Sequence, residues 1–91
     1  MKGIGITDVN VTFGNQKGEF TIWFGNIERI TTEKDSYSDL DFDCRIYTKE
    51  PLHDGWTAET VPFRDAPTRD AFYRAISTAK LMWDTRYPDL R

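Results

Sequence analysis

The chain lacks most of the features that identify a disulfide-bonded, secreted or membrane protein. Its 91 residues include one cysteine, so no intramolecular disulfide can form. No apolar run has the length of a signal peptide or approaches the ~20 residues of a membrane-spanning helix. These absences predict a cytoplasmic protein that has no membrane partner and folds by its hydrophobic core alone.

An excess of one charge is also missing from most of the chain. Residues 1–31 carry three acidic and three basic residues, and residues 51–91 carry six of each. The net charge of −3 therefore arises in residues 32–50, where six acidic residues accompany three basic ones. General affinity for nucleic acid needs clustered lysine and arginine, so this distribution argues against it. An acidic segment instead favours a partner with a basic surface.

Aromatic residues are plentiful, with six phenylalanines, four tyrosines and three tryptophans. Each aromatic side chain buries roughly 150–250 Å², which suits a small core without a disulfide. A chain of this length is typical of one domain. We therefore predict a single domain over residues 1–91 with an aromatic-rich core.

Alternating apolar and polar residues predict four strands, at about residues 4–13, 19–31, 40–48 and 56–63. The sequence GNQKG at 14–18 predicts a hairpin turn between the first two strands.

Three positions modify these strands. The apolar phase slips near Thr7-Asp8, which predicts a β-bulge, and Gly25-Asn26 predicts a second one. Pro62 cannot donate to a strand partner, so it places the fourth strand at a sheet edge.

Residues 66–86 are predicted to form a helix. Asp65 is a suitable N-cap, Pro67 is tolerated in the first turn, and Pro88 prevents continuation. Apolar residues recur at three- and four-residue spacing and predict one buried stripe made of Phe72, Ala75, Ile76, Ala79, Met82 and Trp83. The predicted fold class is α+β: a four-stranded, mostly antiparallel sheet with one C-terminal amphipathic helix packed on one face.

The segment SDLDFDCRIYTKE, residues 38–50, matches part of a calcium-binding loop. Aspartates at 39, 41 and 43, an apolar Ile46 and Glu50 have the spacing of an EF-hand, but Cys44 stands where the loop needs glycine. Leu40, Phe42, Cys44 and Ile46 also alternate with polar residues, which favours a strand with one buried face. We therefore expect a strand whose aspartates face solvent, and no cofactor or metal.

No group of residues predicts catalysis. Cys44 lies on the apolar side of its predicted strand and is expected to be buried, and the single histidine, His53, lies in a turn without a nucleophile to activate. The sequence therefore predicts a protein that is not an enzyme.

A non-enzymatic protein-binding module is the function that the pattern favours. Trp23, Tyr47, Arg45 and Asp43 share one phase of their strands and are expected on the sheet face that the helix leaves uncovered. The predicted partner-binding residues are Asp35, Tyr37, Asp39, Asp41 and Asp43 for electrostatic attraction, with Trp23 and Tyr47 as aromatic anchors.

Size and acidity are typical of small inhibitors encoded by phages or mobile elements, which occupy the basic groove of a nucleic-acid-binding protein. Three alternatives remain open. The uncovered sheet face could bind nucleic acid, the acidic loop could bind calcium, or an open strand edge could form a homodimer.

Overall fold

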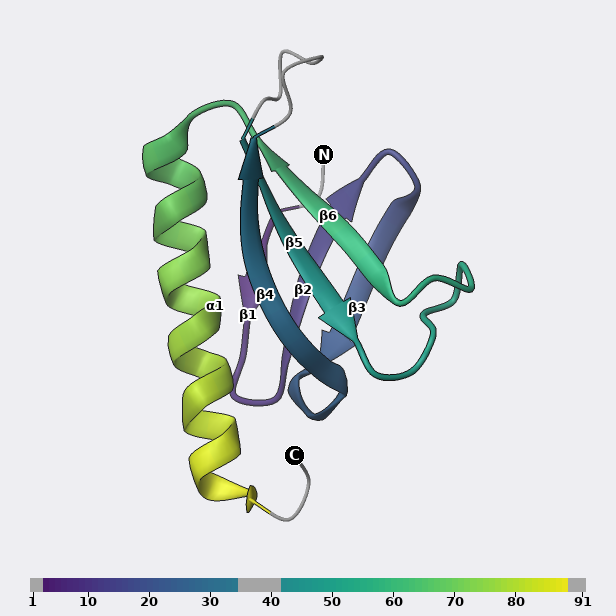
Figure 1. The fold of residues 1–91 in the computed structure, drawn as a ribbon, viewed down its shortest axis with the longest axis vertical. Coiled ribbons are helices and arrows are strands. Elements are labelled where there is room, and N and C mark those ends of the chain that lie inside the picture. Colours follow the sequence, from purple (N-terminus) through teal and green to yellow (C-terminus); the bar gives the residue numbers. More distant parts are fainter. Residues whose placement is uncertain (1–2, 35–41, 89–91) are drawn as a thin grey trace.

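The computed structural model describes residues 3–34 and 42–88, and the residues described form two three-stranded antiparallel sheets and a long helix (Figure 1). The first sheet has the strand order β1-β2-β3 and the second has the order β4-β5-β6. The elements are β1 (Gly5–Ile6), β2 (Asn10–Asn15), β3 (Gly18–Trp23), the 3₁₀ turn η1 (Phe24–Asn26), β4 (Ile27–Lys34), β5 (Phe42–Thr48), β6 (Ala58–Phe63) and α1 (Ala66–Arg86).

The first predicted strand is in fact two strands joined by a turn. Thr7 closes this turn, because its Oγ1 accepts hydrogen bonds from the backbone N–H groups of Val9 (3.1 Å) and Asn10 (3.0 Å). Such side-chain bonds offer the backbone an alternative to a strand ladder. β1 therefore folds back and pairs with β2. The predicted bulge marked the right position, but the chain reverses there.

The second predicted strand also divides, at η1. Trp23 ends β3, the chain turns through Phe24–Asn26, and Ile27 begins β4 in the other sheet. The prediction of one four-stranded sheet is therefore wrong, because this turn moves the chain from one sheet to the other. The α+β class and the C-terminal helix are confirmed.

The second sheet follows its predicted pattern more closely. In β5, Cys44, Ile46 and Thr48 are buried on the inner side as alternation predicts, whereas Phe42, also predicted to be buried, is half-buried. It pairs with β4 on one side and with β6 on the other. β6 contains Pro62 and is an edge strand of this sheet, as predicted.

Helix α1 begins and ends at the predicted residues. Asp65 caps it by accepting a 2.7 Å hydrogen bond from the Thr68 N–H. Phe72, Ile76 and Trp83 are buried in the predicted stripe. The same prediction is wrong for Ala75 and Met82, which are exposed. In the part of the chain described, no helix is both long enough and apolar enough to cross a membrane.

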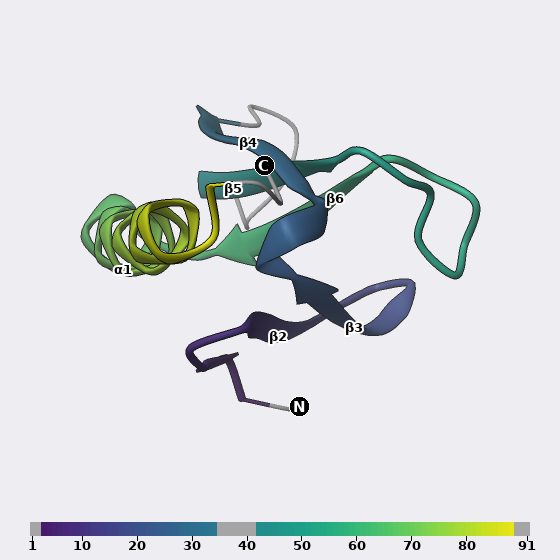
Figure 2. The ribbon, with the colours of Figure 1, turned by 90° about the horizontal axis from the view of Figure 1, so that it is seen from below.

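The core lies between the two sheets and the helix. Viewed from below, the sheets lie one above the other and α1 runs along one side of them (Figure 2). The helix contacts all three strands of the second sheet, together with η1 and β1. The buried apolar side chains are Val11, Phe13, Phe20, Ile22, Phe24, Ile27, Cys44, Ile46, Val61, Phe63, Phe72, Ile76 and Trp83. Both sheets and the helix therefore contribute to one hydrophobic cluster.

Candidate partner-binding surface

The predicted acidic residues are placed only in part. Asp35, Tyr37, Asp39 and Asp41 lie outside the described residues. Asp43 is on β5, opposite Glu33 and Pro62, and only 8% of its surface is exposed. The expectation that Asp43 faces solvent is therefore wrong, although strand alternation does place it on the outer side of the sheet.

Trp23 and Tyr47 do not share a face. Trp23 is the last residue of β3 in the first sheet, whereas Tyr47 lies on β5 in the second. Their predicted common surface required a single sheet, and the turn at η1 removes it. Any partner that uses both residues would have to contact two separate surfaces.

Tyr47 lies among arginines on the outer side of the second sheet. The Arg29 guanidinium covers the ring of Tyr47 at 4.1 Å from its centroid, and Arg45 forms a 2.9 Å ion pair with Glu33. Hydrogen bonds from Arg45 and then Arg29 lower the pKa of the Tyr47 hydroxyl. With its ring face occupied by Arg29, Tyr47 is less suited to act as an anchor or to stack a nucleobase.

Trp23 is exposed on the first sheet and lies beside two other aromatic residues. About half of its surface (47%) is exposed, although the indole contacts other aromatic rings. Its ring meets that of Trp83 edge-on at 5.5 Å, and Trp83 in turn packs against Tyr87 at 4.5 Å. We call these three residues the aromatic cluster.

Gly25 determines where the Trp23 indole lies. A Cβ atom at Gly25 would lie 2.5 Å from two carbons of the Trp23 ring, too close for any side chain to be accommodated without moving the ring. The indole therefore rests directly on the backbone of η1. The exposed indole thus contacts Trp83 on one side and the Gly25 backbone beneath it.

Met82 extends the surface beside the aromatic cluster. It is 56% exposed, and Tyr87 within the cluster is 38% exposed. A small depression of about 50 Å³ lies next to them and is lined by Thr7, Asp8, Ala79, Met82, Trp83 and Arg86. The sequence-based prediction missed this surface because it assigned Met82 to the core. The four-residue spacing of Trp83 and Tyr87 was the available signal.

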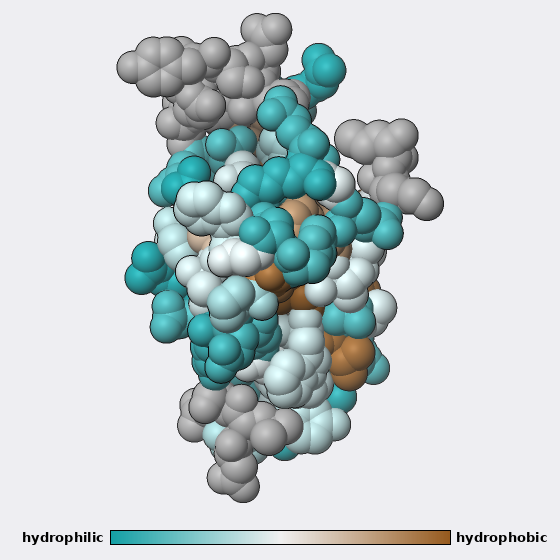
Figure 3. Space-filling view, turned by 90° about the vertical axis from the view of Figure 1, so that its right-hand side faces the viewer, coloured by the Kyte–Doolittle hydropathy of each residue, from teal (hydrophilic) through white to brown (hydrophobic). Residues whose placement is uncertain are grey.

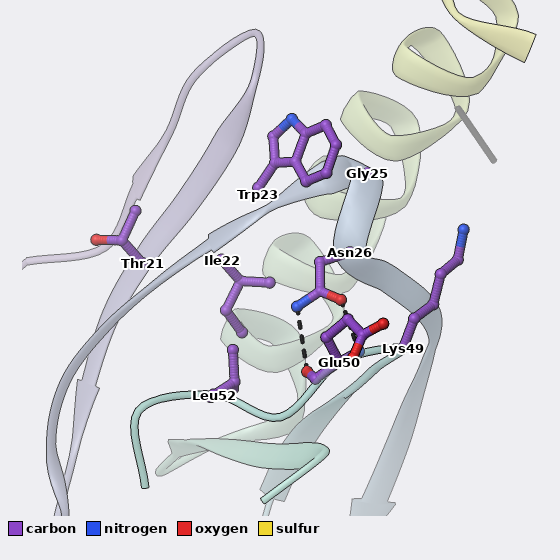
Figure 4. Close-up of a pocket in the computed structure, with 8 residues that line it drawn as sticks. All are labelled: Thr21, Ile22, Trp23, Gly25, Asn26, Lys49, Glu50 and Leu52. Carbon is purple, nitrogen blue, oxygen red and sulfur yellow. Dashed lines mark hydrogen bonds between the residues drawn. The ribbon is translucent and has the colours of Figure 1, made fainter. Parts of the chain in front are cut away.

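A second feature adjoins Trp23 on its other side. A groove of about 420 Å³ is lined by Thr21, Ile22, Trp23, Gly25, Asn26, Lys49, Glu50 and Leu52 (Figure 4). Figure 4 shows the side chains of Ile22 and Leu52 pointing toward one another below the Trp23 ring. Asn26 fixes the opposite side, because its Oδ1 accepts from the Glu50 N–H (2.8 Å) and its Nδ2 donates to the Glu50 carbonyl (3.3 Å).

A polar cluster holds the β2–β3 hairpin tip against the second sheet. Lys17 Nζ lies 3.1 Å from Asp54 Oδ2 and 3.3 Å from Glu59 Oε2. Burial, and then a hydrogen bond with Asp54, raise the pKa of Glu59, whereas the same hydrogen bond is the main cause that lowers the pKa of Asp54 to about 2. The Glu59 carboxyl therefore keeps its proton to a higher pH than the Asp54 carboxyl does.

The remaining sequence predictions concern single residues. Cys44 is fully buried, as predicted, and burial raises the pKa of its thiol to about 12. His53 is exposed, but it is more than a solvated turn residue. Its ring stacks on Phe20 with centroids 4.5 Å apart, and its Nε2 lies 3.2 Å from the Glu19 carbonyl.

Within the described ranges, no group of three or more His, Cys, Asp or Glu side chains could hold a metal ion. On the face in Figure 3, exposed hydrophobic groups (brown) lie among hydrophilic ones (teal).

Comparison of the chain with protein-family models, curated proteins and solved structures finds no match.

Proposed function

We propose that this protein acts by binding another protein through the aromatic cluster and does not itself catalyse a reaction. The observation that carries the proposal is the position of Trp23, half-exposed yet held over Gly25 and against Trp83. Tryptophan is enriched among the few residues that supply most of the binding energy at protein interfaces. A ring already held in place loses little conformational entropy on binding.

The acidic residues supply the second part of this proposal. Asp35, Asp39 and Asp41 are in the segment that joins β4 to β5, and no basic residue lies between Asp35 and Asp43. Negative charge on one segment raises the association rate with a positively charged partner. The partner that we propose is therefore a basic, nucleic-acid-binding protein, and occupation of its basic groove would inhibit it. Inhibitors of this kind are encoded by phages and mobile elements.

Affinity capture from the natural host tests the proposal with two tryptophan variants. Trp23→Ala removes the anchor, whereas Trp56→Ala removes an even more exposed ring (64%) that lies over Lys17, away from the cluster. We expect the wild type and Trp56→Ala to retain the same host protein and Trp23→Ala to lose it. Recovery of the same proteins by all three forms would show that the aromatic cluster is not the binding surface.

The charge of the partner is tested with the purified captured protein. Asp39→Lys combined with Asp41→Lys should lower the association rate at low salt, and the difference should shrink as salt screens the charges. Asp43 is left unchanged because it is buried, so its reversal would disturb the fold. An association rate that is unaffected by the double reversal would rule out a basic partner.

A further inference from the structure

We infer that the free edge of β3 binds an extended peptide segment of the partner as an additional strand, with an apolar residue of that peptide in the groove beside Trp23. This inference rests on the proposed protein-binding function and specifies how the partner is recognised. Strand addition at a sheet edge uses main-chain hydrogen bonds for affinity and side-chain pockets for specificity.

Two hydrogen bonds show which backbone groups face the free edge. The Phe24 N–H donates to the Val9 carbonyl (2.9 Å), so the even-numbered residues of this segment bond toward β2. The carbonyl of Glu19 faces the opposite way, toward His53. Since hydrogen bonding alternates along an antiparallel pair, the backbone groups of Thr21 and Trp23 also point away from β2. No backbone partner among the described residues reaches them.

The groove lies directly beside this edge and is formed before any ligand arrives. Thr21–Trp23 form one side, the Ile22 and Leu52 side chains give it an apolar base, and the Trp23 ring covers one end (Figure 4). The Asn26 hydrogen bonds to Glu50 hold the opposite side. A strand paired with Thr21 projects alternate side chains to one face, so one of them can pack on Ile22 and Leu52.

The charges around the groove favour a basic peptide. Glu50 lines the groove, and Glu19 lies on the same face of β3 as Thr21. Both glutamates are exposed, and neither has an ion-pair partner among the residues described. Among the described residues that line the groove, Lys49 is the only lysine or arginine, and its side chain extends away from Ile22 and Leu52 (Figure 4). The ligand is therefore an extended segment in which apolar residues alternate with lysine or arginine.

A second copy of the chain fits this edge poorly. His53 Nε2 already lies 3.2 Å from the Glu19 carbonyl, so among the described residues the outward backbone groups left without a backbone partner beside the groove are those of Thr21 and Trp23. In a symmetric β3–β3 pair, the segment at 49–52 of each copy would also enter the space beside the other. A stable dimer typically buries at least ~1,200 Å², far more than three edge residues provide. A single extended peptide brings no second 49–52 segment to this edge, and it can bind weakly without the area that a stable dimer needs.

The direct test uses a defined probe and ¹⁵N-labelled protein. The probe is a capped peptide of alternating lysine and valine, about seven residues long like an ordinary strand. We expect NMR shift changes at Thr21, Trp23 and Leu52 below about 2 mM peptide, and slower hydrogen exchange of the Thr21 N–H. The same peptide N-methylated on alternate residues cannot pair and should cause no change. No response to the first peptide, or an equal response to both, would overturn the inference.

Two variants test the edge and the groove separately. Thr21→Pro removes one outward N–H and is tolerated at an edge strand, and Leu52→Lys places a repelling charge in the groove. Each should weaken peptide binding by roughly tenfold or more, whereas Trp56→Ala should leave it unchanged. Unchanged binding to Thr21→Pro would contradict strand addition. Since Leu52→Lys lies outside the strands, it still decides the question if Thr21→Pro fails to fold.

These experiments separate the inference from the proposed function. A host protein lost by Trp23→Ala but retained by Thr21→Pro would disprove strand addition and leave the aromatic cluster as the binding surface. If the capture of every host protein is unaffected by Trp23→Ala, the proposed function fails. The peptide titration still tests strand addition independently. A concentration-dependent dimer in light scattering that Thr21→Pro abolishes would show that a second copy is the occupant, which would also overturn the inference.

Discussion

At the residue scale, the fit between Trp23 and Gly25 is the feature most open to direct test. Gly25→Ala should push the indole off its present position, because the new Cβ would lie 2.5 Å from two ring carbons. The half-exposed ring can move toward solvent, so the free energy of unfolding should fall by less than about 1 kcal/mol. If Trp23 is the anchor that we propose, partner binding should weaken as well, because its ring is displaced.

NMR measures this displacement directly, since the chain has three tryptophans and hence three indole N–H signals. The Trp23 signal should shift in Gly25→Ala and stay in place in Gly5→Ala, where an added Cβ meets no atom within 4 Å. An unshifted Trp23 signal in Gly25→Ala would mean that Gly25 does not position the ring.

The sequence predicts the exposure of a single residue when that exposure depends on near neighbours. Trp23 lies on the outer phase of its strand, which predicts an exposed side chain, and its side chain is exposed. Asp43 has the same phase but is buried, because strand alternation gives the direction of a side chain and not what covers it. Its neighbours across the sheet, Glu33 and Pro62, belong to other strands that the sequence does not assign as its partners.

At the scale of elements, α1 was predictable because its signals are local. Its cap, its first-turn proline and its apolar spacing all lie within the helix or next to it. The strand breaks carried a local signal too, a slip of phase near Thr7 and near Gly25. Alternation cannot distinguish a bulge from a change of sheet, because that difference depends on which distant strand pairs with each half.

The N-cap of α1 gives a prediction at this scale. Asp65→Ala removes the acceptor of the Thr68 N–H, so the melting temperature at pH 7 should fall by about 4–8 °C. The hydrogen bond from Thr68 lowers the pKa of Asp65, so this stabilisation exists above the unfolded pKa and is lost as pH falls through the folded one. Asp65→Asn retains a cap without a charge.

Thermal unfolding from pH 7 to pH 2 therefore distinguishes the two variants. The difference in melting temperature between wild type and Asp65→Ala should become smaller in acid. At pH 7 the melting temperature of Asp65→Asn should be closer to that of the wild type than the melting temperature of Asp65→Ala is. Equal melting temperatures of wild type and Asp65→Ala at pH 7 would show that the cap does not stabilise the helix.

At the scale of the whole molecule, the two sheets are joined by polar contacts that no local sequence pattern predicts. Lys17 and Glu59 are 42 residues apart, and their pairing requires the hairpin tip to meet β6. Asn15 strengthens the same junction, because its Nδ2 donates to the Thr60 carbonyl at 2.9 Å. The fold class followed from the sequence, but this junction depends on the packing of one sheet against the other.

The buried carboxyl at this junction makes stability depend on pH in a direction that can be worked out. Burial raises the pKa of Glu59, so the folded chain holds its proton more tightly than the unfolded chain does. The stability from this group is complete below the unfolded pKa, about 4.3, and is lost as pH rises through the folded pKa. Asp54 behaves oppositely: its contribution is present above its unfolded pKa and is lost as pH falls toward about 2.

Glu59→Gln isolates the first of these effects, because glutamine retains the shape and can still donate to Asp54 and accept from Asn15. Relative to wild type, the variant should become more stable as pH rises from 4 to 7, because its glutamine does not ionise whereas the buried Glu59 carboxyl of the wild type must lose a proton. Urea unfolding at several pH values measures that difference. Glu28→Gln, at an exposed position on β4, serves as a matched control, and its stability relative to wild type should not rise in this way. If the wild type instead becomes more stable relative to Glu59→Gln as pH rises, the ion pair with Lys17 outweighs the cost of burying the carboxylate.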